Sequence, residues 1–113
     1  MTLTLARAKG KATDLIETTI GQRLNKIAAV QPEHPALIMP HQSIRWSYAE
    51  FLTQVNKLAT GLLALGLDKG DRVAIWSPNR YAWVLTQFAT AKIGAIMVCI
   101  NPAYRLYELE YAL

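Results

Sequence analysis

The first regular pattern along the chain is an apolar stripe with helical spacing. Across residues 20–31, apolar side chains return every three or four positions, which predicts a short amphipathic helix that ends before Pro32. Thr19 and Gln22 have the spacing of a capping box, in which each side chain accepts a hydrogen bond from the other residue's backbone N–H. The first structured segment is therefore expected to begin near Thr19, after a flexible basic tail of residues 1–18.

A hairpin and a long helix follow this first helix. Short runs at residues 36–39 and 43–46, separated by a polar turn, predict two antiparallel strands. Ser47 and Glu50 form the best capping box of the chain. The apolar stripe that follows them has helical spacing and predicts a long helix over residues 48–63.

Beyond Gly66, which is placed to end that helix, the pattern becomes strand, helix, strand. Unbroken apolar runs at residues 73–76 and 96–100 are typical of parallel strands that are covered on both faces. A helix over residues 80–92 connects them, and a helical crossover of this length joins parallel strands. The predicted fold class is therefore α/β, with strand-helix-strand units and parallel strands. A last helix is expected to start near Arg105.

Composition narrows the class of protein. The 113 residues are 52% hydrophobic and 18% charged, which indicates one folded domain and excludes intrinsic disorder. No apolar run approaches the roughly twenty residues of a membrane span, so none is predicted. The single cysteine, Cys99, excludes a disulfide framework and a zinc site made of cysteines.

The net charge of +4 does not indicate a nucleic-acid partner. Arg7, Lys9 and Lys11 concentrate positive charge in the tail, whereas elsewhere the charges alternate in sign. Phosphate binding needs a basic face on one element, so no nucleic-acid partner is predicted. The tail lacks the apolar core of a secretory signal and is interpreted as a disordered terminus or a weak organellar presequence. The expected compartment is the cytoplasm, or the mitochondrial matrix if the source is eukaryotic.

One loop is a candidate ligand site. Ser77, Pro78 and Asn79 lie between a predicted strand and the helix that follows it. Open α/β sheets bind ligands at the carboxyl ends of their strands, and helix N-termini favour anions. The same three residue types are also what a helix start requires. Both interpretations stay open at this point.

The remaining reactive residue types carry no assigned chemistry. Cys99 lies within an apolar strand and is interpreted as a small buried hydrophobe. Two histidines in polar turns are interpreted as solvated, namely His34 and His41. The tryptophans, with Trp76 on a buried strand, either line an apolar pocket for an acyl chain or pack in the core: Trp46, Trp76 and Trp83. No catalytic, cofactor-binding or metal-ligating residue is therefore assigned.

An ordered set of motifs resembles the adenylate-forming enzymes. The matching stretches are Trp-Ser-Tyr-Ala-Glu-Phe at 46–51, Leu-Gly-Leu-Asp-Lys-Gly-Asp-Arg-Val-Ala-Ile at 65–75, Trp-Ser-Pro-Asn at 76–79, Ala-Lys-Ile-Gly-Ala at 91–95, Ile-Asn-Pro-Ala-Tyr-Arg at 100–105 and Glu-Leu-Glu-Tyr at 108–111. In order and spacing they resemble acyl-CoA synthetases, the AMP-forming fatty-acid–CoA ligases, and particularly the medium-chain type. Each motif alone is weak, and the ordered set is specific.

The resemblance implies a parent enzyme that uses ATP, magnesium and CoA. Such an enzyme joins a fatty acid to ATP as acyl-AMP and then transfers the acyl group to CoA. The family's phosphate loop, its nucleotide-binding stretches and its catalytic lysine would all lie beyond Leu113. Residues 19–113 are therefore expected to be a partial N-terminal α/β subdomain, truncated at Leu113, with no cofactor of its own. Its expected partners are the remaining domains of the parent ligase, and alone it is expected to be inactive.

Two hypotheses of other classes are weighed against this one. The chain could be a stand-alone interaction module that reuses the ligase scaffold and associates with itself. Exposed strand edges and apolar helix faces drive such pairing, so a homo-oligomer is expected. An independent small-molecule-binding domain has less support, because the sequence identifies no convergent polar pocket.

Overall fold

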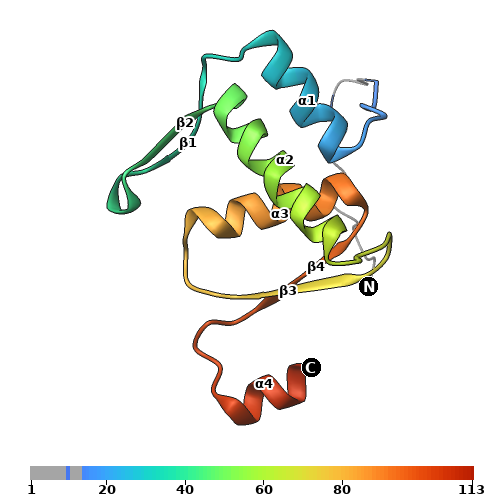
Figure 1. Ribbon diagram of the computed structural model, residues 1–113, viewed down its shortest axis with the longest axis vertical. Coiled ribbons are helices and arrows are strands. Elements are labelled where there is room, and N and C mark those ends of the chain that lie inside the picture. The colour runs from blue at the N-terminus through green and yellow to red at the C-terminus, as the bar shows by residue number, and fades with distance from the viewer. Residues whose placement is uncertain (1–9, 11–13) are drawn as a thin grey trace, which may run out of the picture.

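The computed structural model describes residue 10 and residues 14–113. Three helices pack together at one end of the molecule, and a pair of strands and a short helix form the other end (Figure 1). The elements, in chain order, are α1 (Ile20–Val30), β1 (Pro35–Met39), the 3₁₀ turn η1 (Pro40–Gln42), β2 (Ile44–Ser47), α2 (Tyr48–Ala64), β3 (Arg72–Trp76), α3 (Tyr81–Ile93), β4 (Ile96–Ile100) and α4 (Leu106–Ala112). Most of the predicted tail lies outside the described residues, so its flexibility stays a prediction.

The complete capping box is found at α1 and not at α2. The Gln22 N–H donates to Thr19 Oγ1 at 3.2 Å, and the Thr19 N–H donates to Gln22 Oε1 at 3.1 Å. At α2 the Glu50 N–H donates to Ser47 Oγ at 3.2 Å. The Ser47 hydroxyl, and not its backbone N–H, then donates to the Glu50 carboxylate at 3.2 Å. The predicted box at Ser47 is therefore only half formed.

The predicted helix end at Gly66 is confirmed. Gly66 has a φ of 91°, in the left-handed region that glycine occupies without strain. The Leu67 N–H then turns back toward the Leu62 carbonyl oxygen at 3.4 Å. This turn reverses the chain and delivers it to β3.

The predicted parallel pair is also confirmed, with α3 as its crossover. β3 and β4 pair in parallel from Arg72 opposite Ile96 to Trp76 opposite Ile100. The hairpin of β1 and β2 is antiparallel, as predicted, and forms a separate small sheet. The fold is therefore α/β with a parallel strand-helix-strand unit.

The core lies between the three long helices and not against the parallel strands. Phe51 of α2 and Phe88 of α3 meet edge to face, with ring centroids 5.4 Å apart and an interplanar angle of 82°. The buried apolar cluster consists of Leu24, Phe51, Val55, Ala59, Leu85 and Ala89. The helices thus hold one another, and the strands attach to this unit through α3.

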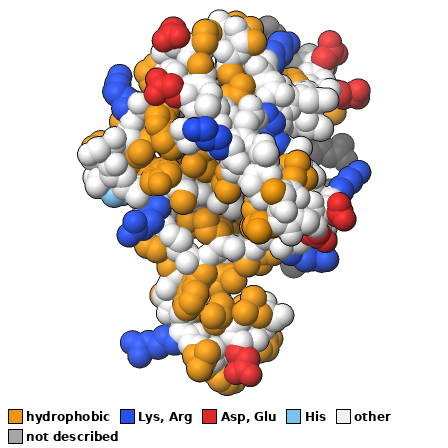
Figure 2. Space-filling model, viewed as in Figure 1, with side chains coloured by type: hydrophobic (Ala, Val, Ile, Leu, Met, Phe, Trp, Pro, Cys, Tyr) orange, Lys and Arg blue, Asp and Glu red, His pale blue; other side chains and the backbone are white. Residues whose placement is uncertain are grey.

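The prediction that both strands are covered on both faces is wrong for the described residues. Trp76 is 50% exposed, Ile96 is 49% exposed, and Cys99 is exposed as well. Figure 1 shows α2 and α3 on one side of the strands, while α4 extends away from them. Figure 2 shows hydrophobic side chains at the surface where the strands join α4. The apolar runs identified the strands, but the described chain places no helix over their second face.

Candidate functional site

The loops after β3 and β4 lie at the same edge of the parallel pair. The Trp76 indole N–H donates to the Asn101 carbonyl oxygen at 3.1 Å, which ties the two loops together. The Trp83 indole N–H donates to the Ser77 carbonyl oxygen at 3.2 Å, which ties the first loop to α3. The edge where open α/β sheets bind ligands is therefore formed by two loops that indole hydrogen bonds hold in place.

The predicted ligand loop reaches this edge with two exposed residues. Pro78 and Asn79 are exposed, whereas Ser77 is half-buried and its hydroxyl donates to the Pro78 carbonyl oxygen at 3.0 Å. The Tyr81 N–H, at the start of α3, donates to Gln42 Oε1 at 2.8 Å. Because η1 already caps α3, one of the N–H groups that an anion would use is occupied by the protein itself.

The candidate metal ligands do not converge. Within residues 14–113, no group of three or more histidine, cysteine or acidic side chains is placed to hold a metal ion. His34 and His41 lie at exposed positions on either side of β1. The Glu108 carboxylate accepts the Arg105 N–H at 3.2 Å and so serves the start of α4.

Within residue 10 and residues 14–113, no helix is long and apolar enough to span a membrane.

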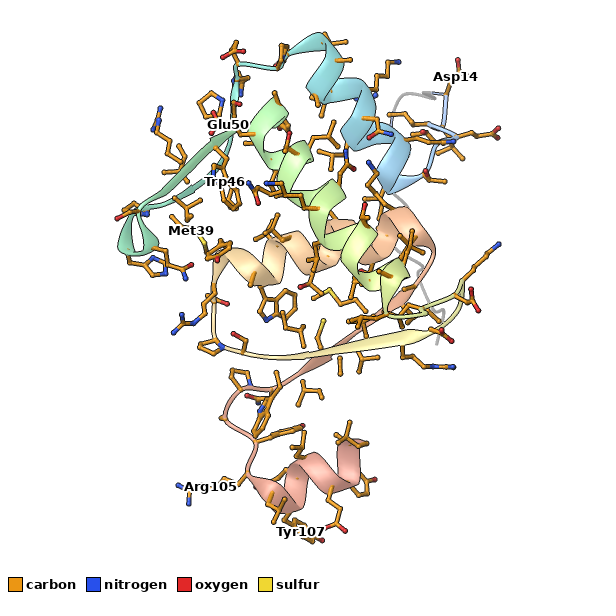
Figure 3. All side chains as sticks on the ribbon, in the orientation of Figure 1. Asp14, Met39, Trp46, Glu50, Arg105 and Tyr107 are labelled. Carbon is orange, nitrogen blue, oxygen red and sulfur yellow. The ribbon has the colours of Figure 1, made fainter. Side chains whose placement is uncertain are left out.

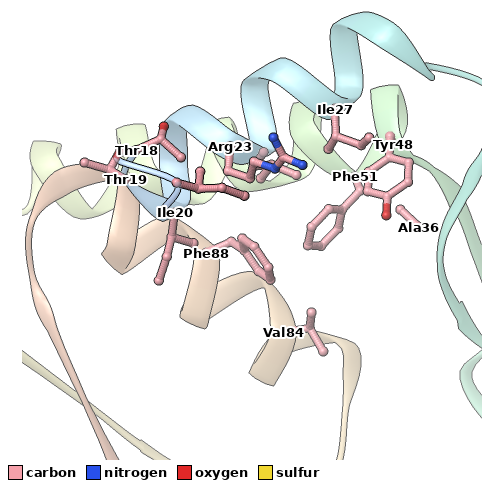
Figure 4. Close-up of a pocket in the computed structure, with 12 residues that line it drawn as sticks. Thr18, Thr19, Ile20, Arg23, Ile27, Ala36, Tyr48, Phe51, Val84 and Phe88 are labelled. Carbon is pink, nitrogen blue, oxygen red and sulfur yellow. The ribbon is translucent and has the colours of Figure 1, made fainter. Parts of the chain in front are cut away.

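The structure contains an apolar cavity that the sequence did not reveal. It has a volume of about 590 Å³ and lies between α1, α3, β1 and the start of α2 (Figure 4). Its apolar lining includes Ile20, Ile27, Phe51, Val84 and Phe88. The helical spacing placed each of these side chains on an apolar face. The sequence does not show how far apart these faces lie, so only the folded structure reveals the space between their side chains.

None of the three tryptophans lines this cavity. Trp46 packs edge to face on Tyr81, with ring centroids 5.6 Å apart. Figure 3 shows Trp46 at the hairpin, away from the β3–β4 strands. Trp76 and Trp83 instead donate the loop hydrogen bonds described above. Packing and loop support are therefore the roles that the structure gives to the tryptophans.

A polar contact at the surface joins the three long helices. Lys92 Nζ on α3 donates to Asn25 Oδ1 on α1 at 2.9 Å and to Asn56 Oδ1 on α2. Partial burial removes water from the ammonium group and lowers the pKa of Lys92 below its usual value of 10.5. The contact is structural, because both partners are amides and no reactive group lies within it.

Comparison with known proteins identifies the class to which this fold belongs. Residues 24–113 match the family described as AMP-binding enzyme. The chain is 50% identical over 99 residues to the medium-chain acyl-CoA ligase ACSF2, mitochondrial, of Mus musculus, covering 88% of this chain. It superimposes on a Mycobacterium tuberculosis fatty acyl CoA synthetase with a TM-score of 0.79 and 35% identity, covering 82% of this chain and 18% of the other. The N-terminal domain of FACL13 from the same organism gives a TM-score of 0.81 and 35% identity, covering 85% and 24%.

The fold is thus that of the N-terminal domain of adenylate-forming acyl-CoA synthetases. The chain belongs to the AMP-binding enzyme family, as its ordered motifs predicted. It spans 16% of the length of the mouse ligase. It corresponds to the N-terminal region of such ligases.

Proposed function

We propose that this chain is the N-terminal scaffold of an AMP-forming fatty-acid–CoA ligase with a medium-chain substrate. The observation that carries the proposal is the family match over residues 24–113, together with 50% identity to a medium-chain acyl-CoA ligase. The whole ligase would form acyl-AMP from a fatty acid and ATP, release pyrophosphate, and then exchange AMP for CoA. Its cofactors would be ATP, magnesium and CoA, and its partners in the fold would be the remaining domains of the ligase.

The residues of this chain would support that chemistry without performing it. The described residues offer no cluster of metal-ligating side chains, so we derive no step through magnesium from them. The ligand-facing role of Ser77, Pro78 and Asn79 is the one direct contact that we propose. It is supported by the exposure of Pro78 and Asn79 at the carboxyl edge of the parallel strands.

An activity assay tests the scaffold proposal. The chain is incubated with ATP, magnesium, CoA and octanoate, while pyrophosphate release and octanoyl-CoA are followed by mass spectrometry. We expect no product from residues 1–113, and octanoyl-CoA from a longer protein if the reading frame continues at the source locus. That frame should encode a Ser/Thr/Gly-rich loop followed by lysine. Thioester formation by residues 1–113 alone would contradict the proposal.

A second assay tests the ligand-facing loop in the complete ligase. Asn79→Ala is compared with Asp68→Ala. Asp68 is an exposed residue in the turn before β3, whereas Asn79 lies in the loop after β3. If Asn79 contacts a bound substrate, the KM for that substrate should rise about fivefold in Asn79→Ala, as expected for loss of one hydrogen bond. Equal kinetic constants for the two variants would show that the loop serves only as the start of α3.

The compartment is a further part of the proposal. The mouse relative is described as mitochondrial, which favours the mitochondrial matrix over the cytoplasm if the source is eukaryotic. A fluorescent protein fused after residue 113 tests this in cells of the source organism. Matrix fluorescence would support the mitochondrial location, and diffuse fluorescence the cytoplasmic one.

The alternative function is a self-associating interaction module. The observation that favours it is the exposure of large apolar side chains on α4, where Leu106 is 80% exposed and Tyr111 is 90% exposed. A natural stop codon directly after codon 113 would favour this alternative, whereas an open frame would favour the ligase scaffold.

A further inference from the structure

The first turn of α3 is held by a side chain from another element. α3 directly follows the loop of residues 77–79, yet its N-cap residue, Arg80, makes no side-chain cap hydrogen bond. The Tyr81 N–H instead donates to Gln42 Oε1 of η1 at 2.8 Å, although the two residues are 39 positions apart in the sequence. The first N–H groups of a helix have no acceptor within the helix. Gln42 therefore supplies an acceptor that the loop itself does not.

The hairpin contacts Tyr81 through its ring as well as through its backbone. Trp46 of β2 packs edge to face on the Tyr81 ring, with an interplanar angle of 84°. Figure 1 shows the turn of the hairpin next to the start of α3. Gln42, Trp46 and Tyr81 are all half-buried, so water competes less for the hydrogen bond between them than it would at an exposed site. The hairpin thus fixes the residue at which the loop becomes a helix.

The turn that carries Gln42 is closed by an unusual backbone conformation. Ser43, the next residue, has a φ of 55°, and among the described residues no other non-glycine residue has a positive φ. Its N–H donates to the Pro40 carbonyl oxygen at 3.1 Å. This left-handed conformation disfavours a residue with a Cβ atom, so it persists only where surrounding contacts fix it. The hydrogen bond from α3 to Gln42 supplies such a contact.

The loop that carries Asn79 is therefore held at both of its ends. At the first end, the Trp83 indole N–H donates to the Ser77 carbonyl oxygen at 3.2 Å. At the second end, Gln42 accepts the first N–H group of α3. Pro78 and Asn79 lie between these two hydrogen bonds and are exposed. The direction of this exposed pair depends on side chains that lie outside the loop.

We propose that Gln42 is a positioning residue for the ligase reaction, because its bond to the Tyr81 N–H sets the direction in which Asn79 meets a bound substrate. The role rests on the proposed function, from which it takes the contact between Asn79 and a substrate. Gln42 acts through α3 and makes no contact with the substrate itself. Its loss should therefore weaken substrate binding and leave the chemical step nearly unchanged.

Hydrogen exchange tests the bond in the chain of 113 residues. Gln42→Ala removes the acceptor, whereas Gln42→Glu keeps an acceptor oxygen and adds a negative charge, which is favourable at a helix N-terminus. The amide exchange rate of Tyr81 is measured by NMR relative to that of Val55, whose fully buried position reports opening of the whole fold. We expect this ratio to rise about fivefold in Gln42→Ala and to stay at the parent value in Gln42→Glu.

The matched control for these variants is His41→Ala, which changes the exposed neighbour of Gln42 within η1. The exchange ratio should be the same in this variant as in the parent chain. An unchanged ratio in Gln42→Ala, or an equal rise in His41→Ala, would overturn the proposal. Because the ratio removes any change in the stability of the whole fold, these outcomes hold even if Gln42→Ala is less stable.

Kinetics test the consequence in the complete ligase, with octanoate, ATP and CoA varied in turn. Gln42→Ala should raise, about fivefold, the KM for the same substrate that Asn79→Ala affects, and should change kcat less than about twofold. Gln42→Glu should restore the parent KM. The double variant should bind that substrate no more weakly than Asn79→Ala alone, because Gln42 acts through that residue.

The kinetic outcomes separate the two proposals. A raised KM in Asn79→Ala with a parent KM in Gln42→Ala would overturn the positioning role and leave the proposed contact of the loop standing. Unchanged constants in Asn79→Ala would overturn the contact of the loop, and the positioning role with it. A fall in kcat in Gln42→Ala without a rise in KM would also overturn the positioning role.

Discussion

Gly21 of α1 lies directly against Lys92 of α3. A Cβ atom at Gly21 would lie 3.0 Å from Lys92 Cγ and 3.3 Å from Lys92 Cα. The contact with Cγ could be relieved by a side-chain rotation, whereas the contact with Cα could be relieved only if the helices move apart. The close approach of α1 and α3 therefore depends on the absence of a side chain at residue 21.

Gly21→Ala should destabilise the fold by about 1 kcal/mol, because overpacking exceeds the helix propensity that alanine adds. Gly61→Ala is the matched control, since Gly61 lies in α2 and a Cβ there would meet no atom within 4 Å. That variant should gain about 0.5–1 kcal/mol from helix propensity. Urea unfolding followed by circular dichroism measures both. Equal stabilisation by the two alanines would mean that α1 and α3 separate without cost.

Trp83→Phe should destabilise the chain by about 1 kcal/mol, because the half-buried Ser77 carbonyl loses its indole donor. Trp76→Phe is the comparison, since it removes a similar hydrogen bond at an exposed position and should cost less than about 0.5 kcal/mol. Chemical denaturation monitored in the far ultraviolet measures the free energy of unfolding of each variant. A larger loss for Trp76→Phe would show that the loop after β4, and not α3, holds the Ser77 loop.

Lys92 should make stability rise with pH just below 10.5. Burial lowers the pKa of Lys92 in the folded chain below the usual 10.5. Between the two pKa values the unfolded chain binds more protons at this residue than the folded chain does, so the free energy of unfolding increases with pH. At lower pH both states carry the charge, and its desolvation cost is fully present.

Lys92→Met isolates this effect, since methionine keeps most of the side-chain length and has no titrating group. The difference in free energy of unfolding, parent minus variant, should increase as pH rises toward 10.5 and level off above it. Thermal melts between pH 7 and 11 measure this difference. If this difference instead falls over the same pH range, the pKa of Lys92 is higher in the folded chain than in the unfolded chain, which would contradict the prediction.

The chain should associate with itself through α4 and the surface next to it. Tyr107 is 79% exposed and Tyr111 is 90% exposed, and Figure 3 shows Tyr107 extending outward from α4. Replacing both with serine should raise the dissociation constant about tenfold, because two aromatic side chains leave the interface. Glu110→Gln is the control on the same helix, and sedimentation equilibrium is the measurement. A monomer at all concentrations would contradict the prediction.

The elements could be predicted from local patterns because their causes are local. The helix that ends at Gly66 needs only an apolar stripe and a residue that tolerates positive φ, and both are visible in the sequence. The parallel pairing of β3 and β4 followed from the length of the crossover between them. Family membership was predicted in the same way, from motifs whose order and spacing the sequence shows directly.

Burial could not be predicted from the same patterns. An apolar run predicts that a strand is suited to be covered, but Trp76 and Cys99 are exposed because no described element lies over them. The half-formed capping box at Ser47 could not be predicted either, since spacing does not show whether the hydroxyl or the backbone N–H of Ser47 donates to the Glu50 carboxylate.

The helices, the strands, the parallel crossover and the family could all be predicted from the order of residues, because each depends on residue types at short spacing. How the faces meet is visible only in the folded chain. The tertiary structure placed Lys92 over Gly21, tied two loops together through indole hydrogen bonds, and left a cavity beside Phe88. Distances between elements depend on how whole side chains interlock, which periodicity along the chain does not specify.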